Sequence, residues 1–259
     1  MLNDLTGKNV VVTGGASGIG AAISKTLAQC GATVVVHYFS SDKAARQLQE
    51  EVEQSASANA GRVVLMQADF STHAGVTAFV EQVGAQFTSL DILVNNTGDL
   101  VERHALGEIT NDFWHTVMAV NLDSMMMVTR GMLPLLKQAN EGASVVNLAS
   151  LAGRKGGHAG SLAYSTAKGA VLTFTRSLAA ELAADKIRVN AVAPGLILGS
   201  KFHATHTTQA SADKTISEIP LQRAGNPMDV ARAVAFLAAE YNGFITGATL
   251  DINGGVYMA

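Results

Sequence analysis

Apolar runs of strand length alternate along the chain with longer stretches of helical periodicity. The valine triplets at 10–12 and 34–36 are apolar on both faces, which fits strands buried beneath helices. Strict alternation of this kind predicts an α/β fold, a doubly wound parallel sheet with helices on both faces. The expected strands are Asn9–Thr13, Thr33–His37, Val63–Gln67, Asp91–Asn95, Ser144–Leu148, Ile187–Val192 and Ala248–Ile252. Helical patterns lie near 18–30, 41–57, 73–87, 111–138, 161–184 and 227–239.

The 259 residues are expected to form one domain. The length alone would allow one or two domains, but no Pro/Gly/Ser-rich linker, internal repeat or low-complexity tract divides the chain. Residues 198–217 lack a clear period and mix small, polar and histidine residues. Long irregular segments in compact domains are often lids or binding loops. This segment is therefore the expected substrate lid, and a surface excursion without a role is the alternative.

Composition excludes several classes of protein. With 48% hydrophobic and 15% charged residues the chain is not disordered, and a net charge of −3 gives no basic field for nucleic acid. The longest uncharged stretch, Asn9–Ser24, carries four glycines and does not fit a membrane span. The first residues do not resemble a secretory signal. Cys30 is the only cysteine, which excludes an internal disulfide and suits a cytoplasmic location.

A glycine-rich segment, TGGASGIG at residues 13–20, follows the first strand and opens the first helix. Without side chains at Gly14, Gly18 and Gly20, the backbone can turn sharply and approach a diphosphate. The helix N-terminus then offers free N–H groups and a partial positive charge. A tight strand-to-helix turn would also need glycine, but the context of strand, loop and helix favours a dinucleotide site.

The end of the second strand bears on which nicotinamide cofactor binds. An acid there would bind the adenosine ribose and repel a 2′-phosphate. The sequence has no carboxylate before Asp42, and Tyr38 and Ser40 offer hydroxyl donors. These features favour NADP(H), with NAD(H) as the alternative. No arginine lies near in the sequence, Lys43 is the nearest cation, and Ser17 stands where a basic residue could help.

Tyr164 and Lys168 are four residues apart in a helical stretch, so their side chains share one face. A phenol with a pKa of about 10 is a poor acid or base near neutrality. A nearby ammonium stabilises the phenolate and lowers that pKa. Such a pair also arises by chance on exposed helices. Ser150, however, follows the fifth expected strand, where its hydroxyl can hydrogen-bond a carbonyl oxygen that faces the tyrosine.

Taken in order, these motifs resemble the short-chain dehydrogenase/reductase family, in the subgroup of chains about 250 residues long. Residues 13–20 match its TGxxxGxG motif, 95–98 match NNAG with Thr97 for alanine, and 164–168 match YxxxK. Pro194-Gly195 and the ending at 245–255 are also typical. The resemblance runs almost end to end. It implies a single NAD(P)-binding domain over 1–259, a seven-stranded sheet in the order 3-2-1-4-5-6-7, and a homotetramer.

The same resemblance implies roles for individual residues. Tyr164 would donate the proton in carbonyl reduction and accept it in alcohol oxidation, Lys168 would lower its pKa, and Ser150 would position the substrate oxygen. Asn121 would hold a water in a proton relay. Gly199 departs from the family pattern, which often has threonine there. The implied cofactor contacts are Gly14, Ser17, Gly18, Ile19, Gly20, Tyr38, Ser40, Asp69, Phe70, Asn96, Gly98, Tyr164, Lys168, Pro194, Gly195 and Ile197.

Several candidates also converge without any appeal to the family. Six of them lie within a few residues after an expected strand, and in an open parallel sheet such ends share one edge, where ligands bind. These six are Gly14, Tyr38, Asp69, Asn96, Ser150 and Pro194.

The expected function is hydride transfer between a nicotinamide cofactor and a carbonyl or secondary alcohol, either small or linked to an acyl carrier. The overall pattern resembles that of the 3-oxoacyl-carrier-protein reductases and their small-molecule ketoreductase relatives. A catalytically silent dinucleotide sensor or scaffold is the main alternative, but it should have lost one of the three catalytic side chains. A methyltransferase on a similar core would not need the tyrosine–lysine pair. No metal is expected, because His203 and His206 have no acidic third ligand beside them.

Overall fold

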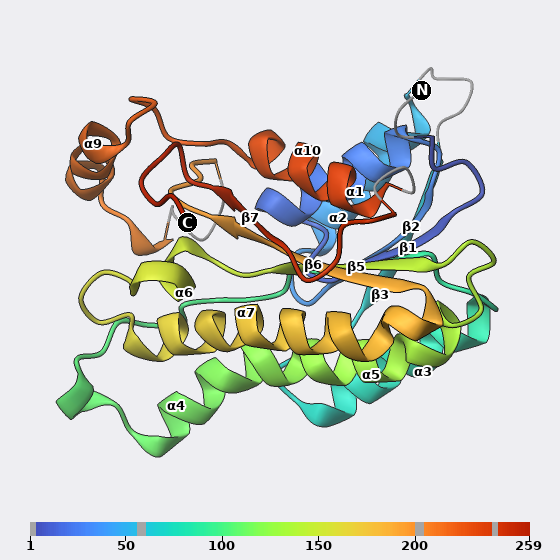
Figure 1. The fold of residues 1–259 in the computed structure, drawn as a ribbon, viewed down its shortest axis with the longest axis horizontal. Helices are drawn as coiled ribbons and strands as arrows, with labels where there is room; N and C mark the ends of the chain where they lie inside the picture. The colour runs from blue at the N-terminus through green and yellow to red at the C-terminus, as the bar shows by residue number, and fades with distance from the viewer. Residues whose placement is uncertain (1–3, 56–60, 200–204, 240–242) are drawn as a thin grey trace.

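The computed structural model describes residues 4–55, 61–199, 205–239 and 243–259. Its strands form one parallel sheet in the order β3-β2-β1-β4-β5-β6-β7, as the family resemblance implies. Helices cover both faces of this sheet (Figure 1). The strands are β1 (Asn9–Val12), β2 (Thr33–Tyr38), β3 (Arg62–Gln67), β4 (Ile92–Asn95), β5 (Ala143–Leu148), β6 (Ile187–Pro194) and β7 (Thr249–Ile252).

Two hydrophobic clusters hold the layers together, one on each face of the sheet. Val10 and Val12 of β1 pack into the first cluster, while Val11 between them packs into the second. This alternation explains why the valine triplet is apolar throughout. The first cluster contains α1 (Gly18–Gln29), α2 (Asp42–Glu53) and α10 (Pro227–Ala238). The second contains α3 (His73–Gln86), α5 (Ser124–Leu136) and α7 (Leu162–Leu182).

The predicted helix over 111–138 is interrupted. The structure has α4 (Asn111–Met118), a π-helical turn over Ala119–Asp123, and then α5. Within this turn, Asn121 Nδ2 donates to the Val117 carbonyl oxygen at 2.9 Å. A side chain that inserts into the backbone ladder in this way is a common cause of such a bulge.

The segment 198–217 is not irregular throughout, because its second half forms a helix. Helix α9 (Gln209–Glu218) begins after Thr208, whose hydroxyl accepts from the Ser211 N–H at 3.3 Å. Ala212 is the one buried residue of α9, which leaves no apolar stripe to reveal the helix in the sequence. Residues 200–204 of the segment lie outside the described residues.

Short elements complete the edge where the strands end. Helix α6 (Leu151–Lys155) follows β5, and η1 (Leu106–Glu108) lies between β4 and α4. Both α6 and α9 lie at the left-hand end of the sheet in Figure 1, beyond the carboxyl ends of the strands. Among the described residues, no helix is long and apolar enough to cross a membrane.

Candidate active site

A cavity of about 820 Å³ lies at the carboxyl edge of the sheet. Its walls come from the loops after six of the seven strands, represented by Gly14, Phe39, Asn96, Ser150, Gly195 and Val256. This volume falls in the range of cofactor and substrate sites. Of the six candidates expected at this edge, Gly14, Asn96, Ser150 and Pro194 lie in the cavity wall, whereas Tyr38 and Asp69 do not.

The glycine-rich loop lines one end of this cavity, with Gly14, Ser17, Gly18, Ile19 and Gly20 all in its wall. Gly14 and Gly18 have φ angles of +60° and +53°, which favour glycine. A Cβ atom on Gly20 would overlap the Gly14 carbonyl group. The loop and the first turn of α1 thus leave an open cradle of backbone N–H groups that fits a diphosphate.

His37 holds this loop in place, a role that the sequence reasoning missed. Its Nδ1 atom accepts from the Gly14 N–H at 3.0 Å, and its Nε2 atom lies 3.1 Å from the Ala68 carbonyl oxygen. The two contacts require the neutral ring with the proton on Nε2. Burial lowers the pKa of His37 to about 4, which keeps the ring neutral at ordinary pH. A polar residue inside an apolar strand was the only sequence signal.

Some predicted adenosine contacts do not lie on the cavity wall. Phe70 is buried and stacks on His37 with ring centroids 3.7 Å apart. Asp69 accepts through Oδ1 from the Ser71 N–H at 2.9 Å. Tyr38 and Ser40 are also absent from the described wall, whereas Phe39 and Ser41 line it.

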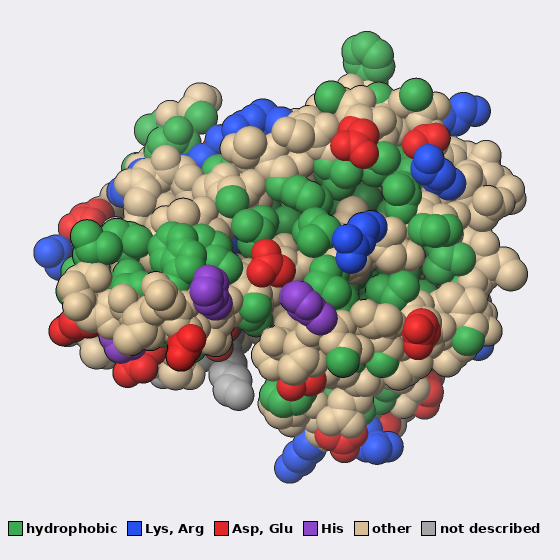
Figure 2. Space-filling model, turned by 90° about the horizontal axis from the view of Figure 1, so that it is seen from below, with side chains coloured by type: hydrophobic (Ala, Val, Ile, Leu, Met, Phe, Trp, Pro, Cys, Tyr) green, Lys and Arg blue, Asp and Glu red, His purple; other side chains and the backbone are tan. Residues whose placement is uncertain are grey.

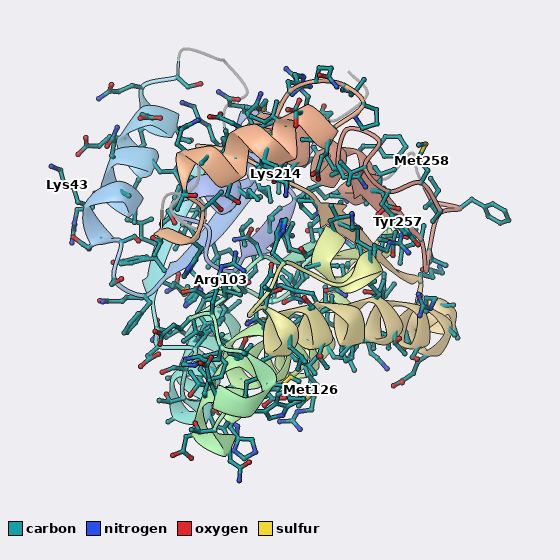
Figure 3. The ribbon with its side chains drawn as sticks, turned by 90° about the vertical axis from the view of Figure 1, so that its left-hand side faces the viewer. Lys43, Arg103, Met126, Lys214, Tyr257 and Met258 are labelled. Carbon is teal, nitrogen blue, oxygen red and sulfur yellow. The ribbon has the colours of Figure 1, made fainter. Side chains whose placement is uncertain are left out.

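The Tyr38 hydroxyl instead donates to Asp42 Oδ1 at 3.0 Å, and Arg46 Nε binds the other oxygen of that carboxylate at 2.9 Å. Arg46 lies one helical turn after Asp42 and pairs with it. The sequence analysis found no arginine near the end of the second strand, but the structure places this one there. Lys43, by contrast, points away from the molecule at its outer edge (Figure 3).

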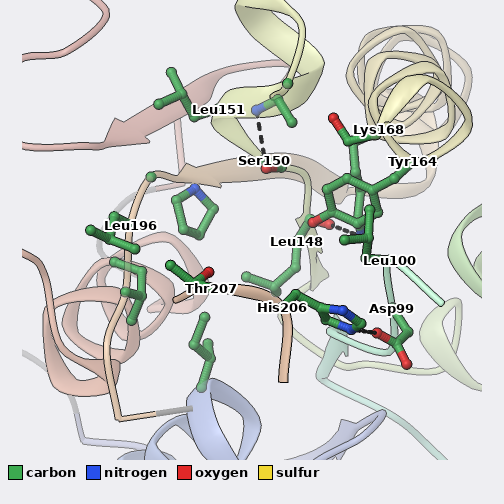
Figure 4. Close-up of a pocket in the computed structure, with 18 of the residues that line it drawn as sticks. Asp99, Leu100, Leu148, Ser150, Leu151, Tyr164, Lys168, Leu196, His206 and Thr207 are labelled. Atoms are coloured by element: carbon green, nitrogen blue, oxygen red, sulfur yellow. Dashed lines mark hydrogen bonds and ion pairs between the residues drawn. The ribbon is translucent and has the colours of Figure 1, made fainter. Parts of the chain in front are cut away.

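Ser150, Tyr164 and Lys168 lie together at the centre of the cavity (Figure 4). Ser150 is the N-cap of α6, and its hydroxyl accepts from the Ala152 N–H at 3.1 Å. Lys168 Nζ donates to the Leu148 carbonyl oxygen at 2.9 Å and lies 5.8 Å from the centre of the Tyr164 ring. The fold thus brings the serine loop and the tyrosine–lysine helix to one point.

Burial and charge set the protonation of this group. Burial raises the pKa of Tyr164 to about 12, a hydrogen bond with Ser150 acts in the opposite direction, and the negative charge of Asp99 raises it further. Burial also lowers the pKa of Lys168 to about 8. In the cofactor-free protein the phenol is therefore protonated at neutral pH and ready to donate.

Asn121 does not line the cavity within the described residues but holds the loop after β4 next to it. Its amide bonds the backbone of Asp99 twice, accepting from the N–H at 3.1 Å and donating to the carbonyl oxygen at 2.6 Å. The absence of a side chain at Gly98 allows Asn121 and Lys168 to lie close to the backbone of this loop. A Cβ atom there would lie 2.7 Å from Asn121 Oδ1 and 2.8 Å from Lys168 Nζ.

Asn96 and Thr97 join the loop after β4 to the glycine-rich loop. Asn96 Nδ2 donates to the carbonyl oxygens of Thr13 and Gly14 at 2.9 and 3.0 Å. The buried Thr97 hydroxyl has no hydrogen-bond partner within the described residues. Thr97 lines the cavity, so an acceptor on a bound cofactor would satisfy a hydroxyl that an alanine would lack.

The far wall is formed by the chain after β6. Pro194, Gly195 and Ile197 line the cavity, and a Cβ atom on Gly195 would lie 2.9 Å from the Asn253 Cβ atom. Gly199 has a φ angle of +83°, which accounts for glycine at this departure from the family pattern.

In the segment 198–217, residues 205–217 also reach the cavity, with Thr205, His206, Thr207, Ser211 and Thr215 in its wall. His206 Nε2 lies 3.2 Å from Asp99 Oδ1. His203 lies outside the described residues. Among those that are described, no cluster of three metal-ligating side chains occurs.

Comparisons with known proteins point to one family. A family model described as enoyl-(acyl carrier protein) reductase matches residues 14–257. The chain is 36% identical to 3-oxoacyl-[acyl-carrier-protein] reductase of Chlamydia pneumoniae, over 97% of this chain and 98% of that protein. It is 33% identical to glucose 1-dehydrogenase 2 of Bacillus subtilis, over 100% and 98%. A solved structure of a DEH reductase A1-R′ mutant superposes with a TM-score of 0.87 at 29% identity, over 100% of both chains.

Proposed function

The chain belongs to the short-chain dehydrogenase/reductase family of NAD(P)-dependent oxidoreductases, and on this premise we propose that Tyr164 is the acid and base of its reaction. The reaction interconverts a carbonyl compound and a secondary alcohol. The observation that carries the proposal is the meeting of Ser150, Tyr164 and Lys168 in a cavity whose other end is a glycine-rich cradle.

When bound, the nicotinamide dinucleotide supplies or accepts the hydride. The chain's own residues bind the diphosphate at Gly14–Gly20 and hold the substrate oxygen between the hydroxyls of Ser150 and Tyr164. In reduction Tyr164 gives its proton to that oxygen, and in oxidation the phenolate takes it back. Lys168, with Nζ 5.8 Å from the centre of the Tyr164 ring, favours the phenolate when it carries its proton. Asn121 holds the loop that carries Asp99.

Replacing Tyr164 by phenylalanine tests this mechanism. We expect Tyr164→Phe to abolish turnover while cofactor binding persists, because only the hydroxyl is removed. Binding is measured by the change in NADPH fluorescence and turnover by absorbance of the nicotinamide. Near-normal kcat in the variant would exclude the mechanism. A silent sensor, the alternative function, would bind cofactor but turn over none of a panel of ketones and alcohols.

NADP(H) is the proposed cofactor. Ser17 and Ser41 line the adenosine end of the cavity, and the Asp42 carboxylate is already held by Tyr38 and Arg46. Both features favour a 2′-phosphate over a ribose hydroxyl that needs a free acid. The ratio of kcat/KM for NADPH and NADH measures the preference, and a tenfold preference for NADH would reverse it.

The proposed substrate is a small or acyl-carrier-linked carbonyl compound, as the 3-oxoacyl and glucose relatives suggest.

We propose one NAD(P)-binding domain over 1–259, with residues 198–217 as its substrate lid, in a cytoplasmic homotetramer. Support for the assembly comes from the face seen in Figure 2, where hydrophobic side chains cover much of the surface. Phe113, Trp114 and Met126 are only partly buried. Light scattering would measure the assembly.

A further inference from the structure

Two cationic side chains line the cavity away from the glycine-rich loop. Arg103 lies in the loop between β4 and η1, and Lys155 is the last residue of α6. Figure 3 looks onto this edge of the molecule and shows Arg103 near the middle of the view. The other charged residues in the described wall are Lys168, Asp99 and Glu218, apart from histidines.

Arg103 is held by backbone carbonyl groups. Its Nη1 atom donates to the Ala159 oxygen at 3.1 Å, and its Nη2 atom donates to the His206 oxygen at 3.4 Å. The neighbouring His104 N–H donates to the Gly160 oxygen at 3.1 Å. Arg103 therefore joins the loop after β4, the loop before α7 and the lid.

These bonds orient the guanidinium without neutralising it. A guanidinium has five N–H groups, and carbonyl oxygens carry no net charge. Across the described ranges, no carboxylate lies within ion-pairing distance of Arg103 or Lys155. The two acids nearest to Arg103 in sequence contact histidines instead. Asp99 lies 3.2 Å from His206, and Glu102 lies 3.3 Å from His104.

The chain as a whole is acidic, with a net charge of −3, so a pair of unmatched cations in its cavity is not a by-product of a basic surface. Charged groups that line a ligand cavity fix the orientation and the identity of the ligand. The planar fork of arginine matches a carboxylate, and lysine adds a second positive charge.

We propose that the substrate is a small carbonyl or hydroxy compound with its own carboxylate, which Arg103 binds with the help of Lys155. This inference rests on the proposed function, because it assumes that Ser150 and Tyr164 hold the reacting oxygen. One end of the substrate is then fixed by charge and the other by hydrogen bonds, so the reacting carbon is set at a defined position between them. A long carrier-linked acyl chain without a carboxylate near its carbonyl would leave both cations unmatched.

The test uses straight-chain keto acids, with the ketone at positions two to five, beside the methyl ester and the amide of each. For at least one chain length we expect kcat/KM of the acid to exceed that of its ester and amide at least tenfold. Arg103→Gln keeps an N–H donor for the carbonyl oxygens but loses the charge. It should bring acid and amide within about twofold of each other while reduction of the amide persists.

Two further variants separate charge from structure. Arg103→Lys keeps the charge and should retain part of the preference for the acid, and Lys155→Gln should lose part of it. Arg62→Gln is the matched control and should keep the full preference, because Arg62 is an exposed residue at the start of the edge strand β3. The KM for the acid should rise with ionic strength in the wild type and rise less steeply in Arg103→Gln, where only Lys155 remains.

The outcomes separate the two proposals. Equal use of acid and amide by the wild type, or equal loss of both in Arg103→Gln, would overturn the carboxylate inference and leave the reductase function standing. Binding is measured separately, by calorimetry with NADPH-loaded protein. Tight binding of a keto acid that weakens tenfold in Arg103→Gln, with no turnover of any compound, would support the inference while overturning the proposed function.

Discussion

The imidazole of His206 and the carboxylate of Asp99 join the segment after β6 to the loop after β4, with 3.2 Å between Nε2 and Oδ1. Asp99 is fixed in turn by two hydrogen bonds between its backbone and the Asn121 amide. Figure 4 shows the pair beside Tyr164. The carboxylate that holds His206 therefore also carries the negative charge that raises the pKa of Tyr164.

Removing the Asp99 charge should lower the pKa of Tyr164, because that negative charge raises it. Alcohol oxidation needs the phenolate, so the rise of kcat/KM with pH should move to lower pH in Asp99→Asn, by about one unit or less at a separation of several ångströms. The measurement is a pH profile with a fixed alcohol. His206→Asn keeps the carboxylate and should not move the profile to lower pH. An unmoved profile in Asp99→Asn would show that its charge does not reach Tyr164.

The buried Lys168 should make the cofactor-free protein more stable at alkaline pH. Its pKa is lowered to about 8 in the folded chain, from 10.5. Between these values the unfolded chain binds more protons, so stability rises with pH. Below pH 8 the burial of the ammonium costs about 3 kcal/mol. Urea unfolding of Lys168→Met should thus give a more stable protein than the wild type at pH 7, with a smaller difference at pH 10.

The exposed Lys43→Met is the control for that experiment, since it should differ little from the wild type at both pH values. A constant difference between Lys168→Met and the wild type across this range would contradict the lowered pKa. The comparison stops at pH 10, because above it Tyr164 ionises more easily in the unfolded chain than in the folded one, where its pKa is about 12.

Gly98→Ala should lower kcat at least tenfold by our estimate, because the new Cβ atom would press on Asn121 Oδ1 and Lys168 Nζ. Steady-state kinetics and the thermal midpoint measure the two consequences, misplaced catalytic groups and strain. Gly107→Ala is a matched control, since a Cβ atom there meets nothing within 4 Å. Wild-type kcat in Gly98→Ala would mean that the two side chains can move without loss.

His37→Leu should weaken cofactor binding about tenfold and change kcat little, because the Gly14 N–H loses its acceptor while the catalytic side chains stay in place. The variant should also lose a pH effect. The pKa of His37 is about 4 when folded and 6.5 otherwise, so the wild type becomes less stable as pH falls through this window. Unfolding at pH 7 and pH 4.5 measures it. Unchanged cofactor affinity in His37→Leu would rule out its role in the loop.

Periodicity predicted the sheet because the strands of a doubly wound fold are apolar on both faces, as the valine triplet of β1 is. The glycine and serine motifs lie in the cavity wall because they follow strands whose ends share an edge, and helix α7 brings Tyr164 and Lys168 to the same cavity. His37 escaped prediction because its two hydrogen bonds join segments far apart in the sequence, Gly14 and Ala68. Helix α9 was not predicted, because it buries too few residues to give an apolar periodicity. The break in the helix at Asn121 was not predicted either, because it depends on a single hydrogen bond from a side chain.

The strand order has a further consequence for how the chain folds. Central strand β1 pairs with β4, so Val10 lies beside Ile92, and the cavity wall takes residues from Gly14 to Val256. Contacts between such distant parts of a chain form slowly, since a long loop must close before they stabilise anything. The cradle is complete only when these pairings exist. A dinucleotide added during refolding will therefore bind late, after most of the backbone is in place, and will stabilise only the finished sheet.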